Sequence, residues 1–283
     1  MNKVAIFSDS TIDLNQEDYA SLNIHIVPLI VNLEGKDYFD GTTISADEIY
    51  ASVAKTGSLP ATAAVGPERL KEAYAPFIKD GYDIVFVGIG AKLSGTVQAS
   101  YIASQDFPAG RIYTVDSQNL SSASGLLAMR ACRLRDEGKS AKQIYDDLTE
   151  TSSRVSAQFG VERLDYLNKG GRCSNLAAMM GRLLHIHPIM KVVDGKLMVY
   201  KKPRGKSEAF YDELVAICKA ELPIEEDHVM VTHAGIEQEH IDYVVSRLSK
   251  IVDPKAIKVT RAGAVISSHC GWGTIGILYI RKK

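Results

Sequence analysis

Apolar runs of strand length recur along this chain, and several of them end in a short segment of small polar residues. Residues 4–7 (VAIF) precede residues 8–11 (SDST), and the almost entirely apolar residues 84–89 precede residues 93–96 (LSGT). Such runs, alternating with helix-length segments, are typical of parallel strands buried on both faces of an α/β sheet. Because ligands of open α/β sheets bind beyond the carboxyl ends of the strands, we expect the polar segments to meet there.

The polar segments share a set of chemical groups. Residues 164–175 (LDYLNKGGRCSN) and 267–269 (SSH) add an arginine and a histidine to the hydroxyl and backbone N–H groups of the first two segments, and acids are few. These donors suit an anionic headgroup, such as a carboxylate or a phosphate, better than a metal ion or a positive charge.

The pattern predicts two α/β lobes, because 283 residues are long for one domain. We assign residues 1–155 to an N-terminal lobe with a mainly parallel sheet and flanking helices. Residues 156–283 form a C-terminal lobe with a mixed sheet, since Asp194-Gly195 between two strand patterns predicts an antiparallel hairpin. No Pro/Ser-rich linker marks the division, which leaves open that the chain crosses between the lobes.

Periodicity and capping signals assign the individual elements. The predicted strands are residues 4–8, 24–31, 84–89, 111–115, 156–161, 189–193, 196–201, 229–232, 257–260 and 275–280. The predicted helices are residues 45–55, 67–79, 94–104, 122–137, 141–151, 164–169, 175–184, 206–220 and 238–250. The apolar residues 264–266 are interpreted as a strand that ends before His269.

Composition excludes several classes of function. The formal net charge is −1, which gives no electrostatic case for nucleic acid. The four cysteines are far apart, so we expect free thiols in a reducing cytosol rather than disulfides or a zinc site. The chain start lacks the apolar core of a signal peptide, and no apolar run approaches the roughly 20 residues that cross a bilayer. We therefore expect a cytoplasmic protein without cofactor or metal.

Residues 93–96 are a candidate anion site. The start of a helix leaves N–H groups free and favours a negative charge, Gly95 allows close approach to the backbone, and Ser94 and Thr96 add hydroxyl donors. An ordinary serine cap is the alternative. A nucleotide phosphate loop is not indicated, because the GxxxxGK[ST] pattern is missing.

Three further residues are candidate ligands of an anion, each with a plain structural alternative. Thr62 lies in a loop of small residues, Arg172 follows two glycines and offers a guanidinium, and His269 stands before a glycine turn. The alternatives are a connecting loop, a helix C-cap followed by a solvated arginine, and an incidental histidine. The spacing of His185 and His187 does not suit a zinc site.

The segments together resemble the DegV family of bacterial fatty-acid-binding proteins over essentially the whole chain. The motifs that carry the resemblance are SDST at 8–11, LPAT at 59–62, LSGTVQAS at 93–100, VDS at 115–117, LDYLNKGGRCSN at 164–175 and AGAVISSHCGWGTIG at 262–276. The resemblance implies two α/β lobes with a long-chain fatty acid, such as palmitate, stearate or oleate, in a cleft between them. It also implies that the protein is a carrier rather than an enzyme, and that it presents the acid to a fatty acid kinase, which makes an acyl phosphate for phospholipid synthesis.

The resemblance assigns roles to individual residues. Thr62, Ser94 and His269 are expected to bind the carboxylate, and Arg172 to lie near the headgroup and assist phosphoryl transfer or kinase docking. Family members carry a loop close to TSQPS where this chain has residues 62–66 (TAAVG), so one hydroxyl is absent at Ala63. The apolar residues 176–180 and 183–184 suit either tail lining or core packing. Transient contact with a membrane is left open.

Two enzymes are the alternatives. A serine esterase or thioesterase would use Ser94 as nucleophile, His269 as base and Asp9 or Asp116 to orient the histidine, but the G-x-S-x-G pattern is missing. A phosphotransferase would hold magnesium with Asp9 and Asp116, whereas capping of turns is the common role of such residues.

Overall fold

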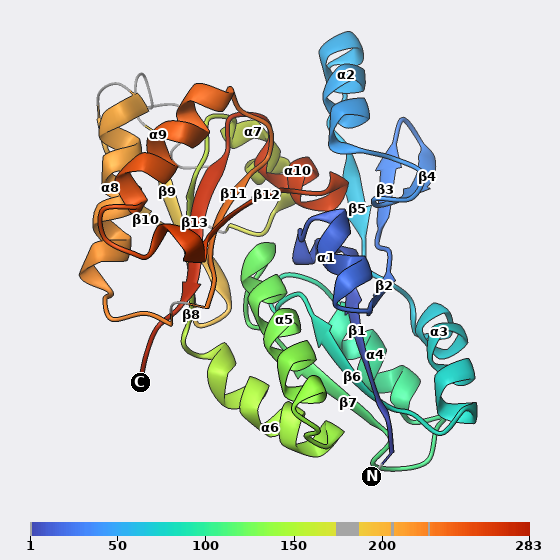
Figure 1. Ribbon diagram of the computed structural model, residues 1–283. Helices are drawn as coiled ribbons and strands as arrows, with labels where there is room; N and C mark the ends of the chain where they lie inside the picture. Colours follow the sequence, from blue (N-terminus) through green and yellow to red (C-terminus); the bar gives the residue numbers. More distant parts are fainter. Residues whose placement is uncertain (1, 174–186, 205–206, 226) are drawn as a thin grey trace.

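The computed structural model describes residues 2–173, 187–204, 207–225 and 227–283. Two α/β lobes lie side by side, each with its own sheet, and a small third sheet stands beside them (Figure 1). The N-terminal sheet is parallel throughout and the C-terminal sheet is mixed, so the predicted fold class is confirmed.

The N-terminal sheet has the strand order β2-β1-β6-β7. Its strands are β1 (Val4–Asp9), β2 (Ile24–Val27), β6 (Asp83–Gly88) and β7 (Ile112–Asp116). One face packs against α3 (Pro67–Lys79) and α4 (Thr96–Ser104), where Phe7 and Phe86 meet Tyr74. The other face packs against α5 (Ser122–Asp136) and α6 (Ala141–Ser152), where Ile6 and Val85 are buried. Burial on both faces explains why these strands have nearly continuous apolar sequences.

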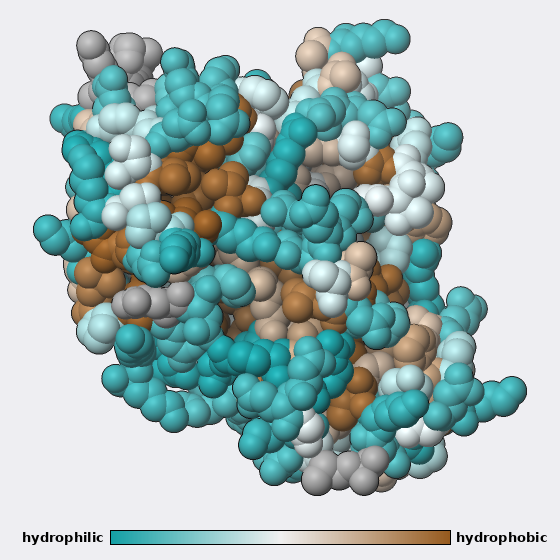
Figure 2. Space-filling view, viewed as in Figure 1, coloured by the Kyte–Doolittle hydropathy of each residue, from teal (hydrophilic) through white to brown (hydrophobic). Residues whose placement is uncertain are grey.

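The C-terminal sheet has the strand order β10-β9-β8-β13-β11-β12. Its strands are β8 (Val155–Gly160), β9 (Ile189–Val193), β10 (Lys196–Lys201), β11 (Val229–His233), β12 (Ile257–Arg261) and β13 (Ile275–Ile280). Helices α8 (Ser207–Ala220) and α9 (Gln238–Leu248) cover one face. The view in Figure 2 is mainly hydrophilic, with hydrophobic residues gathered over part of the C-terminal lobe. Val259 of β12 is exposed.

The prediction of one strand over residues 24–31 is wrong. Strand β2 ends at Val27, and after Pro28 a separate strand, β3 (Ile30–Leu33), enters the small third sheet with β4 (Lys36–Phe39) and β5 (Ala61–Ala63). Proline has no N–H to donate and therefore cannot continue the ladder of β2. Thr62, expected on a loop, lies in β5 and pairs with Val31 of β3.

The strand predicted for residues 264–266 is also wrong. These residues begin a helix, α10 (Ala264–Cys270), which reaches from the C-terminal lobe to the small sheet (Figure 1). Only three apolar residues precede the polar ones, and a run that short does not distinguish strand from helix. Helix α4 begins at Thr96 rather than at Ser94, and the helix predicted for residues 175–184 lies outside the described residues.

Five further elements complete the described part of the chain. They are η1 (Ser10–Ile12), α1 (Gln16–Ser21), α2 (Ala46–Thr56), α7 (Leu164–Gly170) and η2 (Pro254–Ala256). The capping box predicted for α2 is formed, because Ser45 Oγ accepts from Glu48 N–H and the Glu48 carboxylate accepts from Ser45 N–H.

The lobes share one hydrophobic core. Helix α5 packs between the two sheets, so Ile6 of the N-terminal sheet and Phe159 of the C-terminal sheet belong to the same buried cluster. A buried chain of hydroxyl groups crosses the same junction, from Ser122 through Thr232 to Thr260. The junction is therefore a packed interior rather than a loose hinge.

Candidate functional site

Helix α10 is anchored at its start by two buried carboxylates of the N-terminal half. Asp13 Oδ1 accepts from Gly263 N–H at 2.8 Å, and Asp40 Oδ1 accepts from Ala264 N–H at 2.7 Å. Burial raises the pKa of Asp40 to about 6 and raises that of Asp13 well above its usual value. These bonds satisfy N–H groups that a helix start leaves free, and they fix α10 against the N-terminal lobe.

The other end of α10 carries His269 to the small sheet. His269 Nε2 lies 2.7 Å from Thr62 Oγ1 of β5. Burial, with the nearby Arg172 charge, lowers the pKa of His269 to about 4, so the imidazole is neutral at pH 7. Its Nδ1 is buried without a hydrogen-bond partner in the part of the chain that the structure describes. A Cβ on Gly170 of α7 would lie 2.2 Å from Nδ1, so only glycine fits there.

Ser94 lies just before α4, where the chain leaves β6. Its Oγ is 3.0 Å from Thr96 Oγ1 and faces the same pocket as Thr62 and His269. Thr96 is fully buried and Gly95 is exposed, and neither lines this pocket. Of the three residues, Ser94 therefore lies at the same pocket as the other candidates, and Gly95 and Thr96 do not.

Arg172 closes one side of the site. Its Nε donates to Leu93 O at 3.3 Å and its Nη1 to Gly170 O at 2.5 Å, so the side chain bridges the loop before α4 and the end of α7. Within the described ranges, no carboxylate forms an ion pair with Arg172. A guanidinium is suited to bind a carboxylate or a phosphate.

One pocket between the lobes, which we call the headgroup pocket, is lined by Thr62, Ser94, Arg172 and His269. Its enclosed volume is about 60 Å³. The rest of its wall is mainly apolar: Leu29, Ala63, Ala64, Ile89, Leu93, Leu120, Phe159, Leu167, Leu197, Val265, Ile266 and Cys270. Sequence patterns did not indicate Leu197 of the hairpin or the loop residue Leu120, because only the fold brings them here. Ala63 lines the pocket without a hydroxyl, where the family pattern has one.

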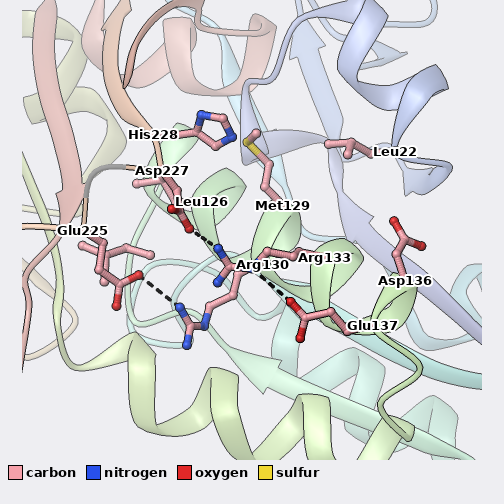
Figure 3. A pocket seen from close by; sticks show the side chains of 11 residues that line it. Leu22, Leu126, Met129, Arg130, Arg133, Asp136, Glu137, Glu225, Asp227 and His228 are labelled. Atoms are coloured by element: carbon pink, nitrogen blue, oxygen red, sulfur yellow. Dashed lines mark hydrogen bonds and ion pairs between the residues drawn. The ribbon is translucent and has the colours of Figure 1, made fainter. Parts of the chain in front are cut away.

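A larger cavity of about 640 Å³ lies elsewhere at the lobe junction (Figure 3). Its arginines are already paired, Arg130 with Asp147 and Glu225, and Arg133 with Asp227. Thr62, Ser94, Arg172 and His269 line the headgroup pocket and not this cavity, so this cavity is not the predicted site.

The acids considered for enzyme chemistry have structural partners. Asp9 accepts from Thr11 N–H at 3.0 Å and Ile89 N–H at 2.8 Å, and Asp116 accepts from Ala91 N–H and Gln118 N–H. No group of three or more metal-ligating side chains gathers among the described residues. His185 lies outside those residues, and the His187 ring packs beside Phe210. His269 contacts Thr62 rather than Ser94, so the pair that a hydrolase needs is not formed.

Comparison with known proteins identifies the family. A model of the DegV family, described as uncharacterised proteins, matches residues 3–282. The chain belongs to the DegV family. A DegV domain-containing protein of Clostridium acetobutylicum is 33% identical over 283 residues and is covered completely, as is this chain.

Solved DegV structures share the architecture. A DegV family protein from Thermus thermophilus, described with fatty acid binding, superposes with a TM-score of 0.92 at 29% identity over 100% of both chains. A stearic acid-binding protein from Eubacterium ventriosum gives a TM-score of 0.86 at 26% identity, covering 100% of this chain and 99% of that one. In the described ranges, no helix of this DegV chain is long and apolar enough to cross a membrane.

Proposed function

We propose that this protein binds a long-chain fatty acid, with the carboxylate held by Thr62, Ser94 and His269 and with Arg172 beside them. The observation that carries the proposal is the convergence of these four polar side chains at an otherwise apolar pocket between the lobes. The DegV proteins described as binding fatty acid or stearic acid support the ligand class.

The energetics favour an acid over a smaller anion. A tail of roughly 15 methylenes gains about 12 kcal/mol on burial, before the costs of ordering and association. The carboxylate then needs only satisfied hydrogen bonds, because an unpaired buried carboxylate would be very unfavourable. The hydroxyl groups of Ser94 and Thr62 can provide these bonds, with His269 acting through the Thr62 hydroxyl, without a buried positive charge at the contact.

The volume of the headgroup pocket is only about 60 Å³. A long acyl chain does not fit into that space, so the apolar side chains of the wall must move aside when the tail enters. Leucine side chains can occupy more than one staggered rotamer, and this makes such an opening compatible with the fold.

The finer proposal is that the protein is a cytoplasmic carrier that presents its acid to a fatty acid kinase, which phosphorylates the carboxylate. Arg172 is exposed and borders the pocket, so it can meet both the headgroup and a docked kinase. Arg172→Gln should reduce acid binding less than about fivefold, since exposed charges contribute little, and should reduce kinase turnover by roughly tenfold or more. Wild-type turnover in the variant would contradict the role of Arg172.

The ligand class is tested by titrating the delipidated protein with stearate and with the primary alcohol of the same length. The two ligands share the tail, so their difference isolates the headgroup contacts. We expect the acid to bind at least tenfold more tightly, in line with hydrogen bonds to a charged group. Equal affinities would contradict a carboxylate site, and turnover of an activated ester that is lost in Ser94→Ala would favour the hydrolase.

A further inference from the structure

A second, smaller cavity adjoins the headgroup pocket. Its volume is about 20 Å³. The two cavities share four wall residues, Leu120, Phe159, Ile266 and Cys270, so the two spaces lie on opposite sides of one thin apolar partition.

The partition is assembled from both lobes. Ile266 and Cys270 are four residues apart on α10 and therefore lie on one face of that helix. Leu120 comes from the loop before α5, and Phe159 comes from β8 of the C-terminal sheet. His269 lines only the headgroup pocket, so the four shared residues stand between it and the smaller cavity.

Beyond the partition, polar residues as well as small and apolar ones line the smaller cavity. The polar residues are Thr232, His233, Ser121 and Thr274, and the last two donate their hydroxyl protons to Asp13 and to Cys270 O inside the wall of this cavity. Ala234, Ala262 and Gly276 border it, with Leu278 beside them. Thr232 also contributes, but its hydroxyl is bonded to Ser122 and Thr260, so it presents no unpaired group to an apolar ligand. Interiors of proteins are close-packed, and two adjacent apolar voids along one helix face are what a collapsed channel leaves when it is empty.

We propose that the smaller cavity is the far end of the acyl channel and that Ala234, Ala262 and Leu278 set the longest tail the protein accepts. The inference rests on the proposed function, since it concerns the tail of the same ligand. Each methylene that finds room in the channel strengthens binding about fourfold, whereas one that meets the end wall must displace packed side chains.

Opposite substitutions at the end wall test this assignment. Ala234→Val fills the cavity and Leu278→Ala enlarges it. Each variant is delipidated, loaded from an equimolar mixture of saturated acids from dodecanoic to eicosanoic acid, and analysed by mass spectrometry. We expect the preferred length to fall by about two carbons in Ala234→Val and to rise by about two carbons in Leu278→Ala.

Matched controls separate this effect from general loss of packing. Ala103→Val and Leu248→Ala change equally buried residues that line neither cavity, and they should keep the wild-type length profile. Ala262→Val replaces Ala234→Val if the latter fails to fold. If the filled and the enlarged variants each bound one acid per chain with the wild-type length profile, the channel assignment would be wrong, and the proposed function would stand. A wild-type protein that takes up no acid would overturn both.

Discussion

At the scale of single residues, the contact between Thr62 and His269 determines what the pocket offers a ligand. The imidazole is neutral, and its buried Nδ1 has no partner among the described residues. A buried N–H without an acceptor is rarer than an unpaired acceptor, so we infer that the proton resides on Nε2 and is donated to Thr62 Oγ1. The hydroxyl proton of Thr62 is then free to be donated to a carboxylate.

Loss of the hydroxyl groups should weaken acid binding. We expect Thr62→Val and Ser94→Ala each to reduce affinity for stearate by about tenfold or more, because each removes a hydrogen bond to a charged group. Calorimetric titration measures the change, and Ser104→Ala, which removes a half-buried hydroxyl at the end of α4 outside the headgroup pocket, is the control. Wild-type affinity in the double variant would refute the headgroup assignment.

His269 should make stability depend on pH. Its pKa is about 4 in the folded state, below the usual 6.5, so between these values the unfolded chain binds the proton and the native state does not. Stability from this residue is therefore present above about pH 6.5 and is lost as the pH falls towards 4. Relative to His269→Gln, the wild type should lose about 2 kcal/mol between pH 7.5 and 5 in denaturant unfolding. Parallel pH profiles of the two proteins would show that His269 is protonated normally.

At the scale of elements, α10 links the binding site to the N-terminal lobe. Asp13 and Asp40 bind its start, and Thr62 contacts His269 near its end. The helix has seven residues, too few to be stable alone, so its position depends on these contacts.

Removal of the Asp40 anchor should weaken acid binding from a distance. Asp40→Ala leaves Ala264 N–H without its acceptor, and we expect a loss of about 1–3 kcal/mol in the free energy of unfolding together with weaker stearate binding. Asp40→Asn retains an acceptor oxygen and should preserve most of both quantities. Asp242→Ala on the exposed face of α9 is the control. If Asp40→Ala kept wild-type affinity, α10 would not need this anchor.

Elements with local signals could be predicted from the sequence, and those set by distant contacts could not. The apolar run at β6 and the Asp194-Gly195 hairpin indicate their own structure. By contrast, β5 exists because Thr62 pairs with Val31, and α10 begins where two distant aspartates bind its N–H groups. The motifs singled out Thr62, Ser94, Arg172 and His269 as candidates, and Gly170 only as one of two glycines before Arg172. Nothing local indicated Asp13 or Asp40.

At the scale of the whole molecule, the headgroup pocket lies where the two lobes share a core. Helix α5 packs against both sheets, and Arg130 and Arg154 both pair with Glu225 across the junction. These contacts hold the lobes in a fixed arrangement, so we expect a ligand to enter by displacement of side chains rather than by wide separation of the lobes.

The most direct test of the account is mass spectrometry of a solvent extract from the purified protein. A carrier that buries a long tail releases its ligand slowly, so the acid should survive purification. We predict one long-chain fatty acid per chain, with less in the Thr62→Val, Ser94→Ala double variant. An extract without fatty acid, even after incubation of the protein with mixed acids, would contradict the account.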